Sequence, residues 1–239
     1  MDSSLPLLLY LLLLLAVLLG WAAGAWLQRR PQLPLRYVLT FSGAYLLGIA
    51  VFHQLPSIYD SHAHHYGLFI MLGFFLQLIL ETFSKGVEHG HAHPEAFPQG
   101  SLPYSLLISL YLHAFLESLA LQSHGDPGHF PVLLWGILVH KVPVAIILYG
   151  LLRQLARRNW QVALGMLFFA LMAPLGALLT QLWPFLQDFY HEVSALVFGI
   201  FLHISTTILF EADKGHHFHR IKFSIIILAL ALAYLSVLH

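Results

Sequence analysis

The sequence predicts an all-α polytopic membrane protein, an eight-helix transmembrane bundle with both termini outside. The chain of 239 residues is 59% hydrophobic and only 9% charged, and its mean hydropathy is +0.77. Soluble proteins are roughly 45–50% apolar and roughly 25% charged. This composition indicates a chain that lies in a lipid bilayer.

Eight segments are long and apolar enough to cross a bilayer, which takes roughly 17–25 mostly apolar residues. Since they use nearly the whole chain, we expect one transmembrane domain over 1–239, with histidine-rich cytoplasmic loops at 85–102 and 212–220. The first segment follows Asp2 and no Lys or Arg, which favours a span over a cleaved signal peptide. The segments lie at about 5–28, 36–56, 66–84, 103–123, 130–153, 160–183, 191–211 and 221–238.

The basic residues predict how the chain is oriented. Because cytoplasmic loops carry an excess of Lys and Arg, the connections that contain them are expected in the cytoplasm and both termini outside. The expected location is the cell membrane, either plasma or bacterial inner membrane. The net charge is zero, and nothing indicates nucleic-acid binding. Ten of the eleven Lys and Arg residues fall in alternate connections: Arg29, Arg30, Arg36, Lys85, Arg153, Arg157, Arg158, Lys214, Arg220 and Lys222.

Four ionisable residues interrupt two apolar segments: His113 and Glu117 in the fourth, and His140 and Lys141 in the fifth. A charged group at mid-membrane costs at least ~2.5–3.5 kcal/mol unless a partner or function compensates it. Residues four apart share a helix face. His140 is expected at the same depth on the next, antiparallel helix. Imidazole and carboxylate suit divalent zinc or iron in a chain without cysteine, so these residues predict a metal site.

A structural interpretation uses the same residues. A buried His–Glu pair can join two helices, with Lys141 neutralising Glu117. Such a pair needs two partners, whereas four ionisable groups converge here. Pro143 also frees a backbone carbonyl near Val139, beside His140. These observations favour a metal site over a purely structural pair.

The fourth and fifth segments resemble those of the ZIP (Zrt-, Irt-like protein) divalent metal transporters. That family carries His-Asn/Ser-x-x-Asp/Glu-Gly in its fourth helix and His/Gln-Glu/Lys-x-Pro-x-Glu, or a variant, in its fifth. The sequence here has His113-Ala-Phe-Leu-Glu117-Ser and His140-Lys-Val-Pro-Val-Ala145. His53-Gln-Leu-Pro56, the histidine-rich loop and Met172-Ala-Pro-Leu-Gly176 extend the likeness over nearly the whole chain.

The resemblance implies that His113, Glu117 and His140 are the ligands of a primary metal site. It implies transport of Zn²⁺, with Fe²⁺, Mn²⁺ and Cd²⁺ as further candidates, by alternating access. It implies no bound cofactor. The oligomeric state stays open, a homodimer being one option.

The resemblance also implies that a second metal site has been lost. The family's fourth-helix Asn is Ala114 here, and the acid after the fifth-helix His is Lys141. The last fifth-helix acid is Val144, and a sixth-helix acid is Ala173. The sequence therefore resembles a single-site variant with His-Lys in the fifth helix, in which the Lys141 ammonium takes the place of a cation.

Further histidines are weaker candidates for metal binding. Those in loops would hold zinc weakly or be solvated, since biased tracts are only compositional evidence. Those in or near the membrane would line the path or pack by hydrogen bonding. Glu81 and Glu211 lie near cytoplasmic helix ends, where solvation is the simpler explanation. The loop histidines are His89, His91, His93, His216, His217 and His219, and the membrane histidines are His53 and His203.

Three functions fit a three-ligand intramembrane site. The first is import of divalent metal into the cytoplasm. The second is an intramembrane zinc hydrolase, which needs a further acid, base or oxyanion-stabilising group, for which Lys141 is the candidate. The third is a metal sensor on a transporter scaffold. The ordered resemblance favours the transporter, so no enzyme is predicted.

Overall fold

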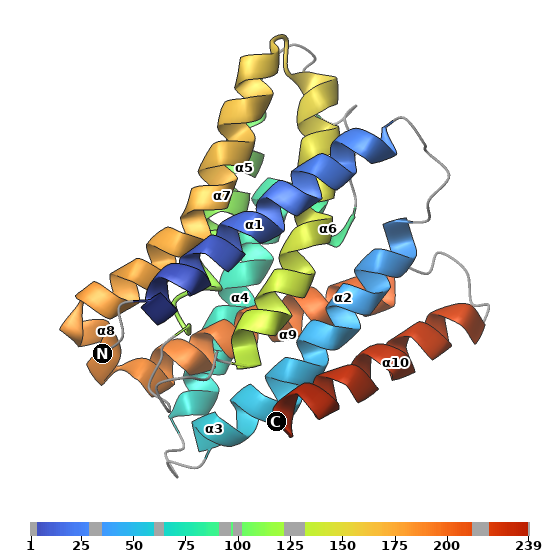
Figure 1. Ribbon diagram of the computed structural model, residues 1–239. Helices are drawn as coiled ribbons and strands as arrows, with labels where there is room; N and C mark the ends of the chain where they lie inside the picture. Colours follow the sequence, from blue (N-terminus) through green and yellow to red (C-terminus); the bar gives the residue numbers. More distant parts are fainter. Residues whose placement is uncertain are drawn as a thin grey trace.

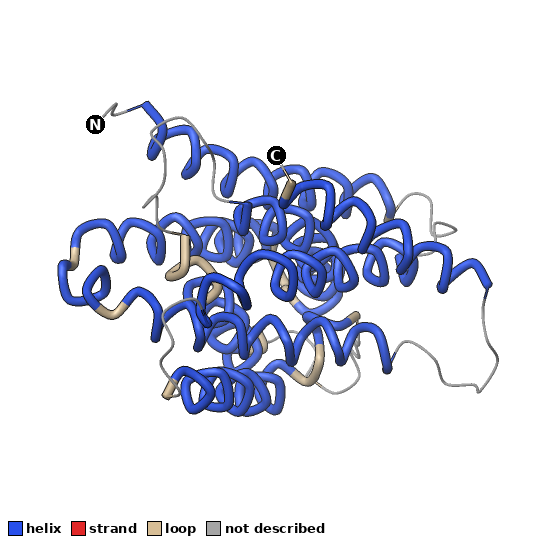
Figure 2. Tube along the Cα trace, turned by 90° about the horizontal axis from the view of Figure 1, so that it is seen from below, coloured by secondary structure: helices blue, strands red, loops and turns tan. Residues whose placement is uncertain are grey.

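The computed structural model describes residues 4–28, 35–59, 65–90, 97, 102–121, 132–211 and 220–238. Almost all of these residues are helical, and Figures 1 and 2 show a bundle of long helices. The helices are α1 (Ser4–Leu27), α2 (Leu35–Ile49), α3 (Leu55–Tyr59), α4 (Tyr66–Ser84), α5 (Tyr104–Leu116), α6 (Val132–Leu155), α7 (Asn159–Leu182), α8 (Pro184–Asp188), α9 (Tyr190–Glu211) and α10 (Arg220–Val237). A π-helical turn, η1 (Ala50–Gln54), joins α2 to α3, and a 3₁₀ turn, η2 (Val87–His89), follows α4.

Seven helical stretches in the described part of the chain are long and apolar enough to cross a membrane: α1, α2 through α3, α4, α6, α7, α9 and α10. The remaining expected span corresponds to α5, which is shorter. Many large apolar side chains lie on the outer surface of the bundle, as expected for helices that face lipid. The prediction of an all-helical polytopic membrane bundle is therefore confirmed.

Helix α6 lies inside the bundle and carries the fifth-segment residues His140 and Lys141. It packs against α1, α2 and α7, and Figure 1 shows α6 and α7 as a hairpin crossed by α1. Helix α10 packs along α2, and α5 packs between α4 and α7. Since the middle of α6 is surrounded by other helices, His140 and Lys141 face protein and not lipid.

Helices α4 and α9 are held together by two glycines. A side chain on Gly73 would overlap the backbone of Leu196, and a side chain on Gly199 would overlap the backbone of Ile70. Small residues let transmembrane helices approach closely enough for their backbones to touch. This contact fixes α4 and α9 relative to one another and sets the separation of their polar side chains.

The fourth span differs from the expected range of 103–123. Helix α5 ends at Leu116, and the backbone hydrogen bonds tighten from the Glu117-to-His113 spacing of four residues to three at Ser118 and Leu119. Two contacts explain this early end. Glu117 pairs with Lys141 on α6, and Gly176 of α7 lies so close that a side chain there would overlap Ser118.

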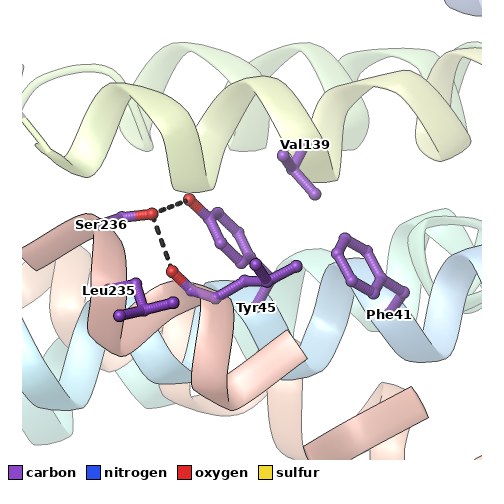
Figure 3. A pocket seen from close by; sticks show the side chains of 6 residues that line it. Phe41, Tyr45, Val139, Leu235 and Ser236 are labelled. Carbon is purple, nitrogen blue, oxygen red and sulfur yellow. Dashed lines mark hydrogen bonds between the residues drawn. The ribbon is translucent and has the colours of Figure 1, made fainter. Parts of the chain in front are cut away.

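A shallow pocket opens between α2, α6 and α10 (Figure 3). The Tyr45 hydroxyl lies 2.9 Å from Ser236 Oγ, which itself donates to the carbonyl of Leu232 at 2.9 Å. The lining has no carboxylate or imidazole, so this pocket is not a candidate metal site. It is lined by Phe41, Tyr45, Val139, Leu232, Leu235 and Ser236.

Candidate metal site

The structure brings the four ionisable residues of the fourth and fifth segments together. His113 lies in the last turn of α5, Glu117 is the residue that ends it, and His140 and Lys141 lie in the middle of α6. Their exposed fractions are only 1% to 2%. Groups buried this deeply need partners, and Glu117 is the partner of both Lys141 and His113.

Of the three predicted ligands, His113 and Glu117 face each other and the ring of His140 lies beside that of His113, but in the described part of the chain the three do not gather their ligand atoms within 4.8 Å of one another. His113 Nε2 is 3.5 Å from Glu117 Oε2, and the rings of His113 and His140 are 6.1 Å apart between centroids and nearly perpendicular. Both ring nitrogens of His140 are buried without a hydrogen-bond partner among the described residues. Because buried polar atoms are normally paired, the two ring nitrogens of His140 make it a candidate for a ligand that the described residues do not supply.

A neighbouring carboxamide determines the tautomer of His113. The Gln77 Nε2 group donates to a Glu88 carboxylate oxygen at 3.2 Å, so Gln77 Oε1 faces His113 Nδ1, also at 3.2 Å. A carbonyl oxygen only accepts, so Nδ1 carries the hydrogen and Nε2 keeps its lone pair. Partners of this kind orient the histidine ligands of metal sites.

Two lone-pair atoms therefore face each other, His113 Nε2 and Glu117 Oε2. Ligands of one tetrahedral zinc, each about 2.0–2.2 Å from the ion, are about 3.4 Å apart. The observed separation of 3.5 Å matches that value. The arrangement suits a cation between the two atoms better than direct contact between two acceptors.

Lys141 occupies the other side of the carboxylate. Its ammonium donates to Glu117 Oε1 and lies 5.2 Å from the centroid of the Phe169 ring. The other positions that the resemblance assigned to a second site are buried and offer no side-chain ligand. They are Ala114, Val144 and Ala173.

A second cluster contains Glu81, which the sequence did not predict as a metal ligand. Glu81, His89 and His203 each offer one ligand atom, and these atoms lie within 4.8 Å of one another. His203 Nε2 is 2.5 Å from Glu81 Oε2, and His89 Nε2 is 3.6 Å from the same oxygen. Glu81, expected to be a solvated residue at a helix end, is instead the centre of a His–Glu–His group.

His89 was expected on a cytoplasmic loop, where it would either hold zinc weakly or be solvated, and the structure places it in a buried turn. Lys85 and Gly86 have positive φ angles of 55° and 71°, which turn the chain back at the end of α4. The turn η2 then packs against α4, α6 and α9, and His89 is buried with an exposed fraction of 7%. Glycine adopts such left-handed angles readily, so Gly86 is the local signal for this reversal.

Among the remaining candidate histidines the structure describes only His53, which belongs to neither cluster. His53 lies in the π-helical turn η1 and is half-buried. The others, His91, His93, His216, His217 and His219, lie outside the described residues.

Comparison with known proteins identifies the family. The family model described as "ZIP Zinc transporter" matches residues 88–236, which is more than half of the chain. Among curated proteins, the zinc transporter ZIP9-B of Xenopus laevis is 28% identical over 173 residues, covering 67% of this chain and 57% of the relative. The zinc transporter ZIP9 of Micropogonias undulatus is 28% identical over 165 residues, covering 64% and 53%.

The chain spans about half the length of the curated relatives that it matches. The family match covers α5, α6, α7, α9 and nearly all of α10, and so contains all four ionisable residues, His113, Glu117, His140 and Lys141. The resemblance that the two helical motifs indicated is confirmed at the level of the family: the chain belongs to the ZIP zinc transporter family.

Proposed function

We propose that the protein is a membrane transporter that moves Zn²⁺ by alternating access through an intramembrane site formed by His113, Glu117 and His140. The observation that carries the proposal is the pair of lone-pair atoms, His113 Nε2 and Glu117 Oε2, set 3.5 Å apart in the interior. The relatives are named zinc transporters, which supports zinc as the ion. His and carboxylate ligands also accept Fe²⁺, Mn²⁺ and Cd²⁺.

The charges of the site favour release over storage. Two neutral imidazoles, one carboxylate and one ammonium sum to zero, so a divalent ion adds two uncompensated positive charges. Lys141 also holds one oxygen of Glu117 and leaves the other for the metal. With three side-chain ligands, the fourth position stays open for water or a carbonyl. Such a site binds an ion in passing and does not trap it.

We further propose that this is a one-ion primary site, with the Lys141 ammonium standing in for a second cation. Support comes from Ala114, Val144 and Ala173, whose buried side chains offer no ligand. The single positive charge of Lys141 neutralises Glu117 continuously, as a resident metal would.

We also propose import into the cytoplasm across the cell membrane, with both termini outside. Helix α2 begins, α6 ends and α10 begins at one end of the bundle (Figure 1), and basic residues lie at these positions. An excess of Lys and Arg marks the cytoplasmic side. The described residues concerned are Arg36, Arg153, Arg157, Arg158, Arg220 and Lys222.

A hydrolase receives less support. The acid or base candidate, Lys141, has its ammonium bonded to the carboxylate of the metal site itself. A catalytic proton donor has to be available to substrate and separate from the ligands. The Lys141 ammonium is therefore already bonded to Glu117 and is not available as the acid or base that hydrolysis requires.

Zinc influx into proteoliposomes tests the proposal. The full chain is reconstituted with an internal zinc-sensitive dye, and wild type is compared with His113→Ala, Glu117→Ala and Ser109→Ala. Ser109 lies on α5, and its buried hydroxyl donates to Leu80 O, so this variant disturbs the same helix without removing a ligand.

Wild type and Ser109→Ala are expected to admit zinc, and both ligand variants should fall to the rate of protein-free liposomes while remaining monodisperse. If wild type carries no divalent ion, the metal sensor and the zinc hydrolase become the favoured functions. A Glu117→Ala variant with the wild-type rate would exclude the proposed site.

A further inference from the structure

We propose that the protein binds an anionic phospholipid along α2, with the headgroup at Arg36 and an acyl chain in the pocket between α2, α6 and α10. Transport of zinc does not require this lipid, so the proposal goes beyond the function above. It rests on the pocket and on a row of aromatic side chains that leads to it. Only the choice of leaflet, the cytoplasmic one, depends on the proposed orientation of the chain.

The pocket presents hydrocarbon to its occupant. Its volume is about 410 Å³, within the range of roughly 300–1,000 Å³ that is usual for small-molecule sites. The polar side chains of the lining are Tyr45 and Ser236, and Figure 3 shows their hydroxyl groups bonded to each other. Ser236 in turn donates to the carbonyl of Leu232. Since both hydroxyl hydrogens are used within the protein, the lining fits an apolar chain better than a polar ligand.

The pocket faces the lipid side of the bundle. Leu232 and Leu235 of α10 line it and are 39% and 50% exposed. Because α2, α6 and α10 are long and apolar enough to span a membrane, side chains exposed between them meet acyl chains and not water. The inner wall includes Val139 of α6, the residue before His140. A chain in the pocket therefore touches the helix that carries His140 and Lys141.

Three aromatic side chains lead from the pocket to the first turn of α2. Tyr37, Phe41 and Tyr45 follow one another at intervals of four residues and so share a helix face. The rings of Phe41 and Tyr45 are stacked, with centroids 6.1 Å apart and an interplanar angle of 10°. From Arg36 to Tyr45 the helix rises about 14 Å, close to the ~15 Å of hydrocarbon in one leaflet. An acyl chain of a lipid whose headgroup lies at Arg36 therefore reaches the pocket.

The guanidinium of Arg36 supplies the charge at the headgroup end. The side chain is exposed, its Nη2 donates to the Tyr37 hydroxyl at 3.2 Å, and its Cζ lies 4.8 Å from the centroid of the Tyr37 ring. This contact holds the charge at the end of the aromatic row. No carboxylate in the described part of the chain pairs with Arg36. The guanidinium can therefore bind a lipid phosphate, and anionic lipids are concentrated in the cytoplasmic leaflet.

Native mass spectrometry of the purified full chain tests the proposal. It compares the affinities for phosphatidylglycerol, for phosphatidylcholine with identical acyl chains, and for glycerophosphoglycerol, which is the anionic headgroup without chains. Arg36→Gln changes the headgroup end, and Leu232→Trp fills the pocket. The matched controls are Arg153→Gln, an exposed arginine near the end of α6, and Leu228→Trp, a 54% exposed position on α10 outside the pocket.

Wild type should bind phosphatidylglycerol about fivefold more tightly than phosphatidylcholine, which is the effect of one basic side chain near an anionic surface. Arg36→Gln should lose that preference. Leu232→Trp should bind both lipids at least about fourfold more weakly, which is the contribution of one buried methylene group. Both controls should behave as wild type, and glycerophosphoglycerol should not bind.

Three results would overturn the site. The first is equal binding of the two lipids by wild type, or unchanged binding in Leu232→Trp. The second is binding of glycerophosphoglycerol as tight as that of phosphatidylglycerol, which would indicate a phosphate site without a chain pocket. The third is a wild-type dimer that retains neither lipid and that Leu232→Trp dissociates, which would assign the pocket to a second copy of the chain. Since zinc is absent from the measurement, failure of this proposal leaves the transport proposal untouched.

Discussion

The ammonium of Lys141 donates a hydrogen bond to Oε1 of Glu117, and the two side chains are only 1% and 2% exposed. The Oε2 atom of the same carboxylate faces His113 Nε2. One carboxylate thus joins a fixed cation on one side to a metal-ligand position on the other. We therefore expect the metal affinity of the proposed site to depend on the charge at residue 141.

Replacing Lys141 with Met is expected to make the thermal stability of the protein depend on bound metal. Removal of one partner of a buried ion pair costs about 3–5 kcal/mol, so the metal-free variant should unfold at a lower temperature than wild type. Zinc should restore stability, because the ion would then neutralise Glu117. Thermal unfolding with and without Zn²⁺ measures both effects.

The control for this variant is Lys222→Met, which removes another buried ammonium that donates to Leu209 O at 2.8 Å on a different pair of helices. It should leave the zinc-induced rise in unfolding temperature equal to that of wild type. If zinc raises the unfolding temperature of Lys141→Met and of wild type equally, the charge of Lys141 and that of the zinc ion are not coupled.

Replacing Gln77 with Leu is expected to weaken zinc binding at the primary site. The carboxamide fixes the His113 tautomer that presents Nε2 to the ion. Loss of such an orienting partner typically costs 10–100-fold, so the zinc affinity should fall by about that factor. Competition with a fluorescent chelator measures the affinity.

Thr82→Ala lies on the same helix, removes a hydroxyl that donates to Ile79 O, and should not change zinc affinity. If Gln77→Leu binds zinc as tightly as wild type, His113 does not need this partner and the assigned tautomer loses its support.

Replacing Gly73 with Ala is expected to separate α4 from α9. The added methyl group would overlap the backbone carbonyl of Leu196, and overpacking of this kind costs about 1–3 kcal/mol. The unfolding temperature should fall accordingly. Gly67→Ala is the matched control, because a methyl group at that α4 position meets open space. Equal stability of the two variants would contradict the close contact.

The apolar spans could be predicted because their signal is local in the sequence. Each expected segment corresponds to a described helix, and the differences lie at the ends. The end of α5 could not be predicted, since Ser118 to Leu121 is as apolar as the helix before it. That end depends on Lys141 and Gly176, which are distant in sequence and adjacent in the fold.

The primary cluster could be proposed from spacing and depth. His113 and Glu117 share a face because they are four residues apart, and the antiparallel neighbour was expected to bring His140 to the same depth. The centroid distance of 6.1 Å between the two rings agrees with that expectation.

The cluster of Glu81, His89 and His203 could not be predicted from the spacing of residues in the sequence. Glu81 and His203 are 122 residues apart, and their contact depends on the glycine-mediated packing of α4 on α9. His89 reaches the same place only through the left-handed turn at Lys85 and Gly86. Neither condition appears in a hydropathy pattern.

The most direct test of the account is the position of the metal at the primary site. Crystals of the protein grown with Zn²⁺, measured at the zinc absorption edge, should show an anomalous peak bounded by His113 Nε2, Glu117 Oε2 and His140, about 2.0–2.2 Å from the ligand atoms. A wild-type protein that transports zinc but shows no peak among these three residues would contradict it.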